Sequence, residues 1–114
     1  MIKLIKEGDE ILHPEKYEYC YKLVEDNQPI GFGAINKNKE NALFIFINKE
    51  HRGKGYGKIL FSKILAETKN IGYNDVKITF SKENTAMQKI AEDSGGKQIS
   101  EDEDSIKYMF SLKE

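Results

Sequence analysis

The sequence of 114 residues contains little cysteine and little histidine, with one Cys and two His. The single Cys20 excludes a disulfide within the chain and a cysteine-based structural zinc site. Because no His lies near it in sequence, we expect Cys20 to be a small half-buried hydrophobe rather than a nucleophile. His13 and His51 fit no spacing typical of metal ligands, and we interpret both as surface imidazoles. The sequence therefore predicts no metal cofactor.

Long apolar runs and an excess of charge of one sign are also missing. No stretch approaches the roughly 20 apolar residues that span a bilayer, and the N-terminus, MIKLIKEGDEI, lacks the apolar core of a secretory signal. We therefore expect a cytoplasmic protein without a membrane partner. Eighteen Lys and Arg against 19 Asp and Glu give a net charge of -1, which argues against a nucleic-acid partner. An apolar fraction of 39% supports one small domain, residues 1–114.

Hydrophobic periodicity predicts strands and helices in the order four strands, helix, strand, helix, two strands. Residues 42–47, ALFIFI, form a near-continuous apolar run that predicts a strand buried on both faces. The connection 8–18 is short and broken by Gly8 and Pro14, so little helix is expected there. This order indicates an α+β or mixed α/β fold with a largely antiparallel sheet. The predicted strands are 2–6, 19–25, 30–36, 42–47, 76–80, 97–100 and 106–112, and the helices begin after Gly57 and at Ser81.

One segment carries the chemistry: residues 51–58, HRGKGYGK, between the apolar strand and a helix. Gly53, Gly55 and Gly57 alternate there, which permits a sharp turn and brings backbone N–H groups close to a ligand. The N-terminus of the following helix adds unpaired N–H groups and a positive dipole end. Residues 48–63 contain five basic residues against one acid, Glu50. The segment is therefore interpreted as an anion-binding loop, with a basic loop that merely caps the helix as the alternative.

Two common phosphate-binding motifs do not fit this loop. A P-loop requires Ser or Thr after its lysine, whereas Lys58 is followed by Ile59. A dinucleotide-binding fingerprint requires a third glycine where Lys58 stands. The ligand class favoured by the loop is a phosphate or pyrophosphate.

The residues of this loop resemble a known family. Arg52, Gly55 and Gly57 fit the [QR]xxGx[GA] signature of the GNAT N-acetyltransferase superfamily. The longer string INKEHRGKGYGKILF is similar to its fourth strand, pyrophosphate loop and following helix, and NTAMQKIAEDSG, from Asn84, resembles its later helix. The resemblance covers roughly the last five-sixths of the chain. It implies a GNAT-like acyl-CoA N-acyltransferase fold, a mostly antiparallel central sheet flanked by helices, here with a reduced N-terminal helical region.

The resemblance also implies a cofactor, acetyl-CoA, lying where strands 42–47 and 76–80 splay apart. Its pantetheine arm would pair with the backbone near Phe46 and Ile47, and its pyrophosphate would bind the amides of the glycine loop. Asn84 would lie near the pantetheine, although capping the second helix is an equally good role. The expected cofactor-binding residues are Phe46, Ile47, Arg52, Gly53, Lys54, Gly55, Tyr56, Gly57, Lys58 and Asn84.

The implied reaction is acetyl transfer to a primary amine, of a small molecule or of a protein lysine or N-terminus, by direct attack in a ternary complex. The family's usual acid, a Tyr seven residues after the Asn, is replaced here by Ala91. Glu40 is a weak candidate for the base, and Tyr108 could face the acceptor, so no catalytic residue is assigned. Ala91 keeps open the alternative of a non-catalytic acyl-CoA-binding or regulatory module. A single-stranded RNA platform is a weaker alternative, disfavoured by the net charge.

The short connection 8–18 leaves no room for the helical pair that walls the acceptor side in this family. The acceptor is therefore expected to be a bulky or exposed amine, unless a second subunit of a homodimer supplies the missing wall.

Overall fold

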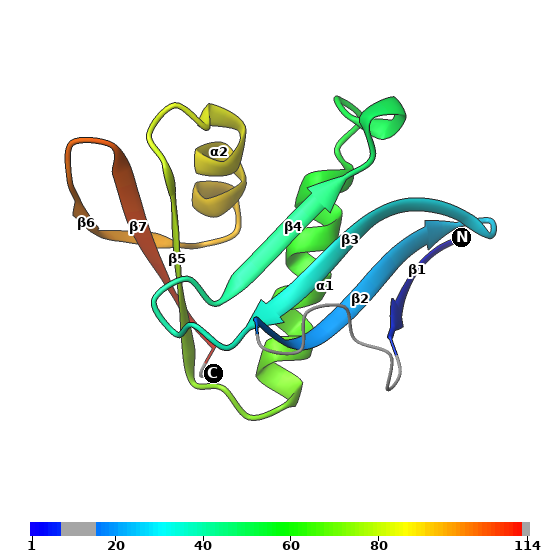
Figure 1. Cartoon of the computed structure of the whole chain (residues 1–114), viewed down its shortest axis with the longest axis horizontal. Helices are drawn as coiled ribbons and strands as arrows, with labels where there is room; N and C mark the ends of the chain where they lie inside the picture. Colours follow the sequence, from blue (N-terminus) through cyan, green and yellow to red (C-terminus); the bar gives the residue numbers. More distant parts are fainter. Residues whose placement is uncertain (8–15, 113–114) are drawn as a thin grey trace.

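The computed structural model describes residues 1–7 and 16–112. Within these ranges the chain follows the predicted order of strands and helices (Figure 1). The reduced helical region expected between the first two strands falls mainly on residues 8–15, outside the described part, as does His13. The elements are β1 (Ile2–Lys6), β2 (Tyr17–Glu25), β3 (Gln28–Asn36), β4 (Leu43–Ile47), the 3-10 helix η1 (Lys49–His51), α1 (Tyr56–Asn70), β5 (Asp75–Ser81), α2 (Thr85–Asp93), β6 (Lys97–Glu101) and β7 (Ser105–Ser111).

The two helices begin at residues other than those predicted. α1 begins at Tyr56, before Gly57, because Gly55 has a left-handed backbone with φ 87° and forms the N-cap. α2 begins at Thr85 rather than at Ser81, which still pairs with β7 at the end of β5. Helix boundaries are set by capping residues, which periodicity alone locates poorly.

β1 to β4 form the first sheet, in sequence order and entirely antiparallel. Asp26 and Asn27 make the β2–β3 turn, with φ of 51° and 69°. Two successive left-handed residues give a two-residue turn whose twist matches that of the strands it joins. Both strands are two residues longer than predicted. β3 begins at Gln28, closer to the turn, and β2 begins at Tyr17, farther from it. Pro29, expected in a connection, lies inside β3 next to a register shift.

β5, β7 and β6 form a second antiparallel sheet in that order. The predicted antiparallel pairing is confirmed, but the sheet is interrupted between β4 and β5, which are edge strands of separate sheets. Figure 1 shows these two edges diverging toward the end where η1 and α2 lie.

α1 joins the two sheets by packing against one side of both. Gly33 of β3 lacks a side chain, and Ile64 of α1 occupies that space. Farther along, the rings of Phe61 and Phe110 lie 5.2 Å apart between α1 and β7. We call this the back of the sheets and the opposite side the front. Both sheets therefore share one buried core centred on α1.

α2 also lies on the back. Tyr108 is two residues before Phe110 on β7 and points to the same side, where its hydroxyl donates a hydrogen bond to Glu92 of α2 at 3.1 Å. Within the described residues no helix is long and apolar enough to cross a membrane.

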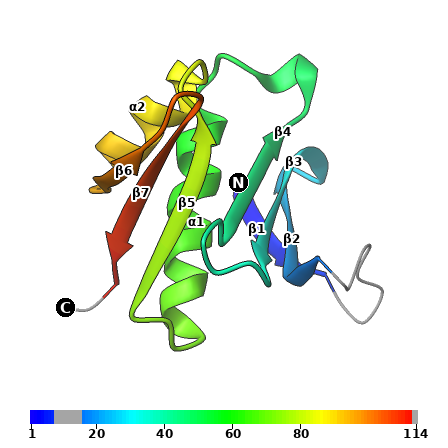
Figure 2. The same cartoon turned by 60° about the vertical axis from the view of Figure 1, so that its left-hand side comes forward.

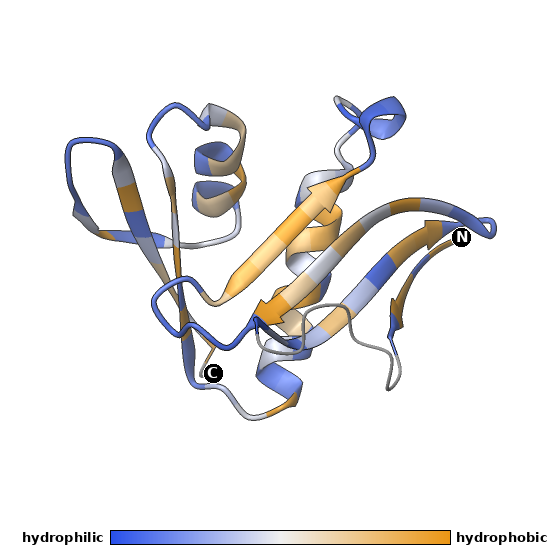
Figure 3. Ribbon diagram, in the orientation of Figure 1, coloured by the Kyte–Doolittle hydropathy of each residue, from blue (hydrophilic) through white to orange (hydrophobic). Residues whose placement is uncertain are grey.

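β4 is the most apolar strand in Figure 3, but the prediction that it is buried on both faces is wrong. Leu43 is buried, whereas Phe44 and Phe46 are 38% and 45% exposed. Since cross-strand neighbours share a face, these two rings lie on the front, opposite α1. A strand at the edge of its sheet with both helices on the back keeps one apolar face accessible.

Candidate functional site

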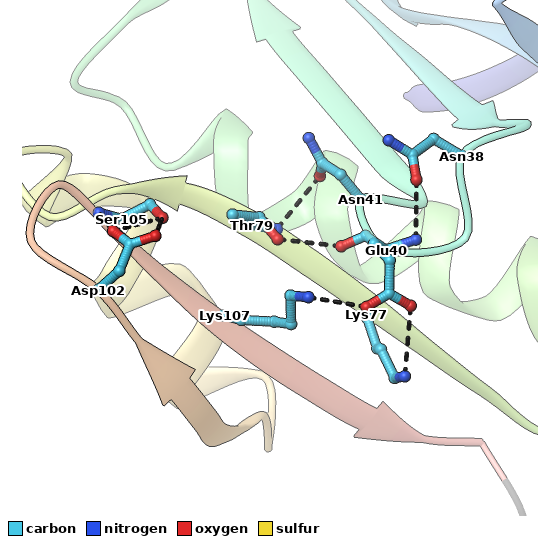
Figure 4. Close-up of polar contacts among 8 residues, drawn as sticks. All are labelled: Asn38, Glu40, Asn41, Lys77, Thr79, Asp102, Ser105 and Lys107. Atoms are coloured by element: carbon cyan, nitrogen blue, oxygen red, sulfur yellow. Dashed lines mark hydrogen bonds and ion pairs between the residues drawn. The ribbon is translucent and has the colours of Figure 1, made fainter.

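The two sheets are held together at one end of the gap between them (Figure 4). The N–H of Ala42 donates to the carbonyl of Lys77 at 2.8 Å, a single strand-like hydrogen bond between the start of β4 and β5. The N–H of Thr79 then donates to the side-chain Oδ1 of Asn41 at 3.2 Å, and the hydroxyl of Thr79 to the carbonyl of Glu40 at 3.0 Å. Side-chain atoms replace strand pairing here, and beyond this point β4 and β5 separate.

A cleft of about 730 Å³ lies where the strands have separated. It is bounded by the end of β4, the η1–α1 loop, the start of α1, and α2. Nine of the ten residues predicted to bind the cofactor line it, and the tenth, Lys54, is exposed on the same loop. The predicted strand, loop and second helix thus meet at one cavity, although Phe46 and Asn84 are 38 residues apart in the sequence.

The glycine loop has the geometry of an anion site. Gly53 and Gly55 have φ of 77° and 87°, and a Cβ at either would meet nothing within 4 Å. It is therefore the left-handed backbone, and not crowding, that requires glycine at these positions. The N-cap Gly55 makes no side-chain cap, and the first turn of α1 contains no acidic residue. The unpaired N–H groups and positive end of the helix dipole are thus left to a ligand.

Arg52 fixes the loop to the end of β4. Its Nε donates to the carbonyl of Ile47 at 2.8 Å, and its guanidinium lies 5.1 Å from the centre of the Phe46 ring. Arg52, the first residue of the family signature, thus contacts two other predicted site residues, Phe46 and Ile47.

Tyr56 connects the loop to the β2–β3 hairpin. Its hydroxyl donates to Glu25 at 2.6 Å, and this hydrogen bond raises the pKa of Tyr56. The ring of His51 meets the Tyr56 ring edge-on at 6.0 Å. The prediction that His51 is a surface imidazole is wrong: it is 9% exposed, because it turns inward at the end of η1 and lines the cleft. Its Nε2 has no hydrogen-bond partner among the described residues.

Lys58 and Asp93 face each other across one end of the cleft. Lys58 is in the first turn of α1 and Asp93 is the last residue of α2, and their charged atoms are 3.7 Å apart. Both side chains are half exposed, at 59% and 40%, so this ion pair is weak and its lysine can exchange partners.

Asn84 performs the capping role. Its Oδ1 accepts a hydrogen bond from the N–H of Met87 at 3.0 Å at the N-terminus of α2. Capping fixes the direction of α2 and turns Met87 and Ile90 to the cleft, where Ile90 packs close to Gly57 of α1. Met87 and Ile90 were not among the predicted site residues; their spacing of three from Asn84, on the same helix face, was the available signal.

The other candidates for acid and base lie elsewhere. Ala91 is fully buried and faces the core rather than the cleft. Tyr108 is 3% exposed, and burial followed by its hydrogen bond to Glu92 raises its pKa. Cys20 is buried rather than half-buried, at 2% exposure, and burial raises its pKa. Within residues 1–7 and 16–112, no three His, Cys, Asp or Glu side chains are grouped to hold a metal ion.

Glu40, the candidate base, forms ion pairs on the front of the second sheet (Figure 4). Its carboxylate lies 2.7 Å from the ammonium of Lys107 and 3.4 Å from that of Lys77. Lys107 first, then Lys77, lowers the pKa of Glu40. A carboxylate with a lowered pKa is a poorer base at neutral pH.

The cleft runs along a strand edge between two antiparallel sheets and ends at a glycine loop and the N-terminus of a helix. This arrangement is that of an acyl-CoA N-acyltransferase fold. The sequence matches the acetyltransferase (GNAT) family over residues 3–95, and the chain belongs to that family. No curated protein is significantly similar to it in sequence.

Solved structures share the fold at low sequence identity. A Bacillus subtilis acetyltransferase in complex with CoA is 14% identical, with a TM-score of 0.80 over 97% of this chain and 99% of that one. An Elizabethkingia anophelis GNAT acetyltransferase with acetyl-CoA bound is 13% identical, with a TM-score of 0.74 over 96% and 97% of the two chains. The Vibrio cholerae spermidine N-acetyltransferase in complex with CoA and spermine is 18% identical, with a TM-score of 0.72 over 88% and 68%.

Proposed function

We propose that this protein transfers the acetyl group of acetyl-CoA to a primary amine by direct attack in a ternary complex. The observation that carries the proposal is the pair of left-handed glycines, Gly53 and Gly55, at the unneutralised N-terminus of α1 beside a cleft of about 730 Å³. A cavity of that size with an anion site at one end suits a long ligand with a pyrophosphate group. Acetyl-CoA would supply a thioester as the acyl donor.

The chain's own residues would hold this donor along the cleft. The amides from Gly53 to Lys58 would bind the phosphates, with Arg52 fixing the loop in place. The edge of β4 at Phe46 and Ile47 has no strand neighbour on the β5 side within the described residues, so its backbone groups can pair with an extended arm. Met87 and Ile90 of α2 would pack against that arm from the other side, since both line the cleft.

The acceptor amine must lose a proton before it attacks. An alkylamine of pKa ~10.4 is neutral in on the order of one molecule per thousand at pH 7. Among the described residues, Glu40 is tied to two lysines and Tyr108 is buried, which argues against either as the proton acceptor. We therefore assign removal of this proton, and protonation of the leaving thiolate, to water. The amide edge of β4 would polarise the acyl carbonyl.

Thermal unfolding with and without acetyl-CoA, followed by thiol release with an amine panel, tests the proposal. Acetyl-CoA should raise the melting temperature, because it binds only the folded state, and Arg52→Ala should reduce the shift. Thiol release should then appear with at least one amine from a panel of aryl amines, polyamines, aminoglycosides and lysine peptides. The absence of a shift at millimolar acetyl-CoA contradicts the proposal, and a shift without turnover favours the non-catalytic binding module.

A further inference from the structure

Four aromatic side chains form one surface on the front of the first sheet, which we call the aromatic surface: Tyr17, Phe32, Phe44 and Phe46. The rings of Tyr17, Phe32 and Phe44 have centroids between 5.8 and 6.4 Å apart. Phe46 is the cross-strand partner of Phe32 and so lies on the same face. Phe44 and Phe46 are among the few large exposed hydrophobic residues of the described chain, and such contiguous exposure marks a binding surface.

The aromatic surface is continuous with the cleft. Phe46 belongs to the surface and also lines the cleft. Figure 2 shows α1 and α2 behind the sheets, and the loop that would hold the donor's phosphates runs from the end of β4 back to the start of α1. A nucleophile must reach the acyl carbon from a side that the donor leaves open, so the acceptor approaches from the front, across β4.

The charges around this surface disfavour an acceptor with several positive charges. The ammonium of Lys16 lies 5.3 Å from the centre of the Tyr17 ring, and the guanidinium of Arg52 lies over Phe46. These two ring faces thus already contact cations of the chain. The neighbouring carboxylate on the front, Glu40, is paired with both Lys77 and Lys107.

Resting on the proposed function, we propose that the acceptor is a primary amine attached to an aromatic body with no further positive charge, such as an arylethylamine or an aromatic amino acid. Its ring packs on Phe44 and Phe32, and its amine reaches the acyl carbon at the edge of β4. The nitrogen lone pair forms the C–N bond, the C–S bond breaks with its electrons on sulfur, and the amine proton passes to water while the thiolate takes one from water.

Steady-state acetylation with matched amines tests this inference. Phenethylamine should be preferred over n-butylamine and over spermidine in kcat/KM, because only the first offers a ring to the surface. Phe44→Ala should raise KM for phenethylamine about tenfold and leave KM for acetyl-CoA unchanged, and Phe44→Leu should do so less. Ile99→Ala is the matched control: Ile99 is an equally exposed hydrophobe, at 44%, on edge strand β6 of the other sheet.

The outcomes separate this inference from the proposed function. Preference for spermidine, or a KM for phenethylamine that Phe44→Ala does not change, overturns the inference while acetyl transfer itself stands. A dimer in sedimentation that Phe44→Glu dissociates shows that a second copy covers the surface, and also overturns it. If acetyl-CoA neither binds nor turns over with any amine, the proposed function fails and this inference fails with it.

Discussion

The side-chain oxygen of Asn41 accepts a hydrogen bond from the N–H of Thr79 at 3.2 Å, so this N–H of β5 is paired with a side chain instead of a neighbouring strand. One residue further along, Ala42 makes the backbone hydrogen bond that joins β4 to β5. The carbonyl of Asn41 is itself held by the Nδ2 of Asn36 at 2.9 Å. This amide therefore fixes the point at which the two sheets begin to separate.

Replacing Asn41 tests that relationship. Asn41→Leu leaves a partly buried N–H without an acceptor, which costs about 1–3 kcal/mol of stability. We expect a lower melting temperature together with a several-fold higher KM for acetyl-CoA, whereas Asn41→Asp, which keeps an acceptor oxygen, should recover most of both. Enzyme kinetics and thermal unfolding of the three proteins measure this. An unchanged KM in Asn41→Leu, despite lost stability, would show that Asn41 does not set the cleft.

Gly55→Ala should impair the anion site through backbone strain alone. A Cβ meets no atom within 4 Å there, but φ is 87°, which costs a non-glycine residue about 1–2 kcal/mol. The loop will relax to relieve this strain, so the thermal shift produced by acetyl-CoA should shrink. Gly72→Ala, with φ 105°, equal free space and a position at the other end of α1, is the control. It should lose similar stability and keep the full shift; equal loss of the shift in both would contradict the site.

Asp93→Asn should tighten acetyl-CoA binding. The change removes a negative charge that lines the cleft and releases Lys58, now 3.7 Å away. An exposed pair contributes up to about 1 kcal/mol, so a few-fold lower Kd is expected, fading as salt screens the charges. Isothermal titration at low and high ionic strength measures it, with Asp75→Asn on β5 as the control. Weaker binding in Asp93→Asn would show that the carboxylate aids the ligand.

Tyr21→Phe should leave stability at neutral pH intact and reduce its loss at alkaline pH. The Tyr21 hydroxyl is buried without a partner among the described residues, so removing it leaves no group unpaired. Burial, and then the charge of Glu67, raises the pKa of Tyr21 to about 12, from 10.0. The folded state thus favours the protonated form, and this contribution is complete below pH 10 and declines between about 10 and 12. Urea unfolding from pH 7 to 11 tests it; parallel curves for both proteins would refute it.

Glu40→Gln should leave acetyl transfer unchanged between pH 7 and 9, because the native carboxylate is engaged by Lys107 and Lys77. Since these lysines lower the pKa of Glu40 from 4.5, its stabilising effect is present above that pH and declines as the pH falls. The wild-type protein should therefore lose stability on acidification more steeply than the variant. A pH-dependent drop in kcat in Glu40→Gln would restore Glu40 as the base.

Much of the fold follows from periodicity and turn chemistry, as the confirmed order of strands and helices illustrates. The gap between β4 and β5 does not, because it depends on Asn41 and Thr79 meeting across 38 residues. Nor does the exposed face of β4, since an unbroken apolar run predicts burial on both sides unless the neighbouring layers are known. The glycine loop is local and was predictable, because backbone conformation restricts residue choice there directly.

The residues that surround the loop were harder to predict. His51 and Asp93 reach the cleft from η1 and from the last turn of α2, and neither has a motif that distinguishes it from a surface residue. Their roles depend on how α2 packs against α1, which is set by the Asn84 cap and the contact between Ile90 and Gly57.

The edges of β4 and β5 that face the cleft lack a strand partner among the described residues, and this has a consequence for the protein in concentrated solution. β4 and β5 present backbone groups that an extended ligand would satisfy. Such an edge is also a template for another polypeptide, which can add to it as a strand. A bound extended ligand should therefore protect this edge, and the ligand-free protein should be the form that aggregates more readily through it.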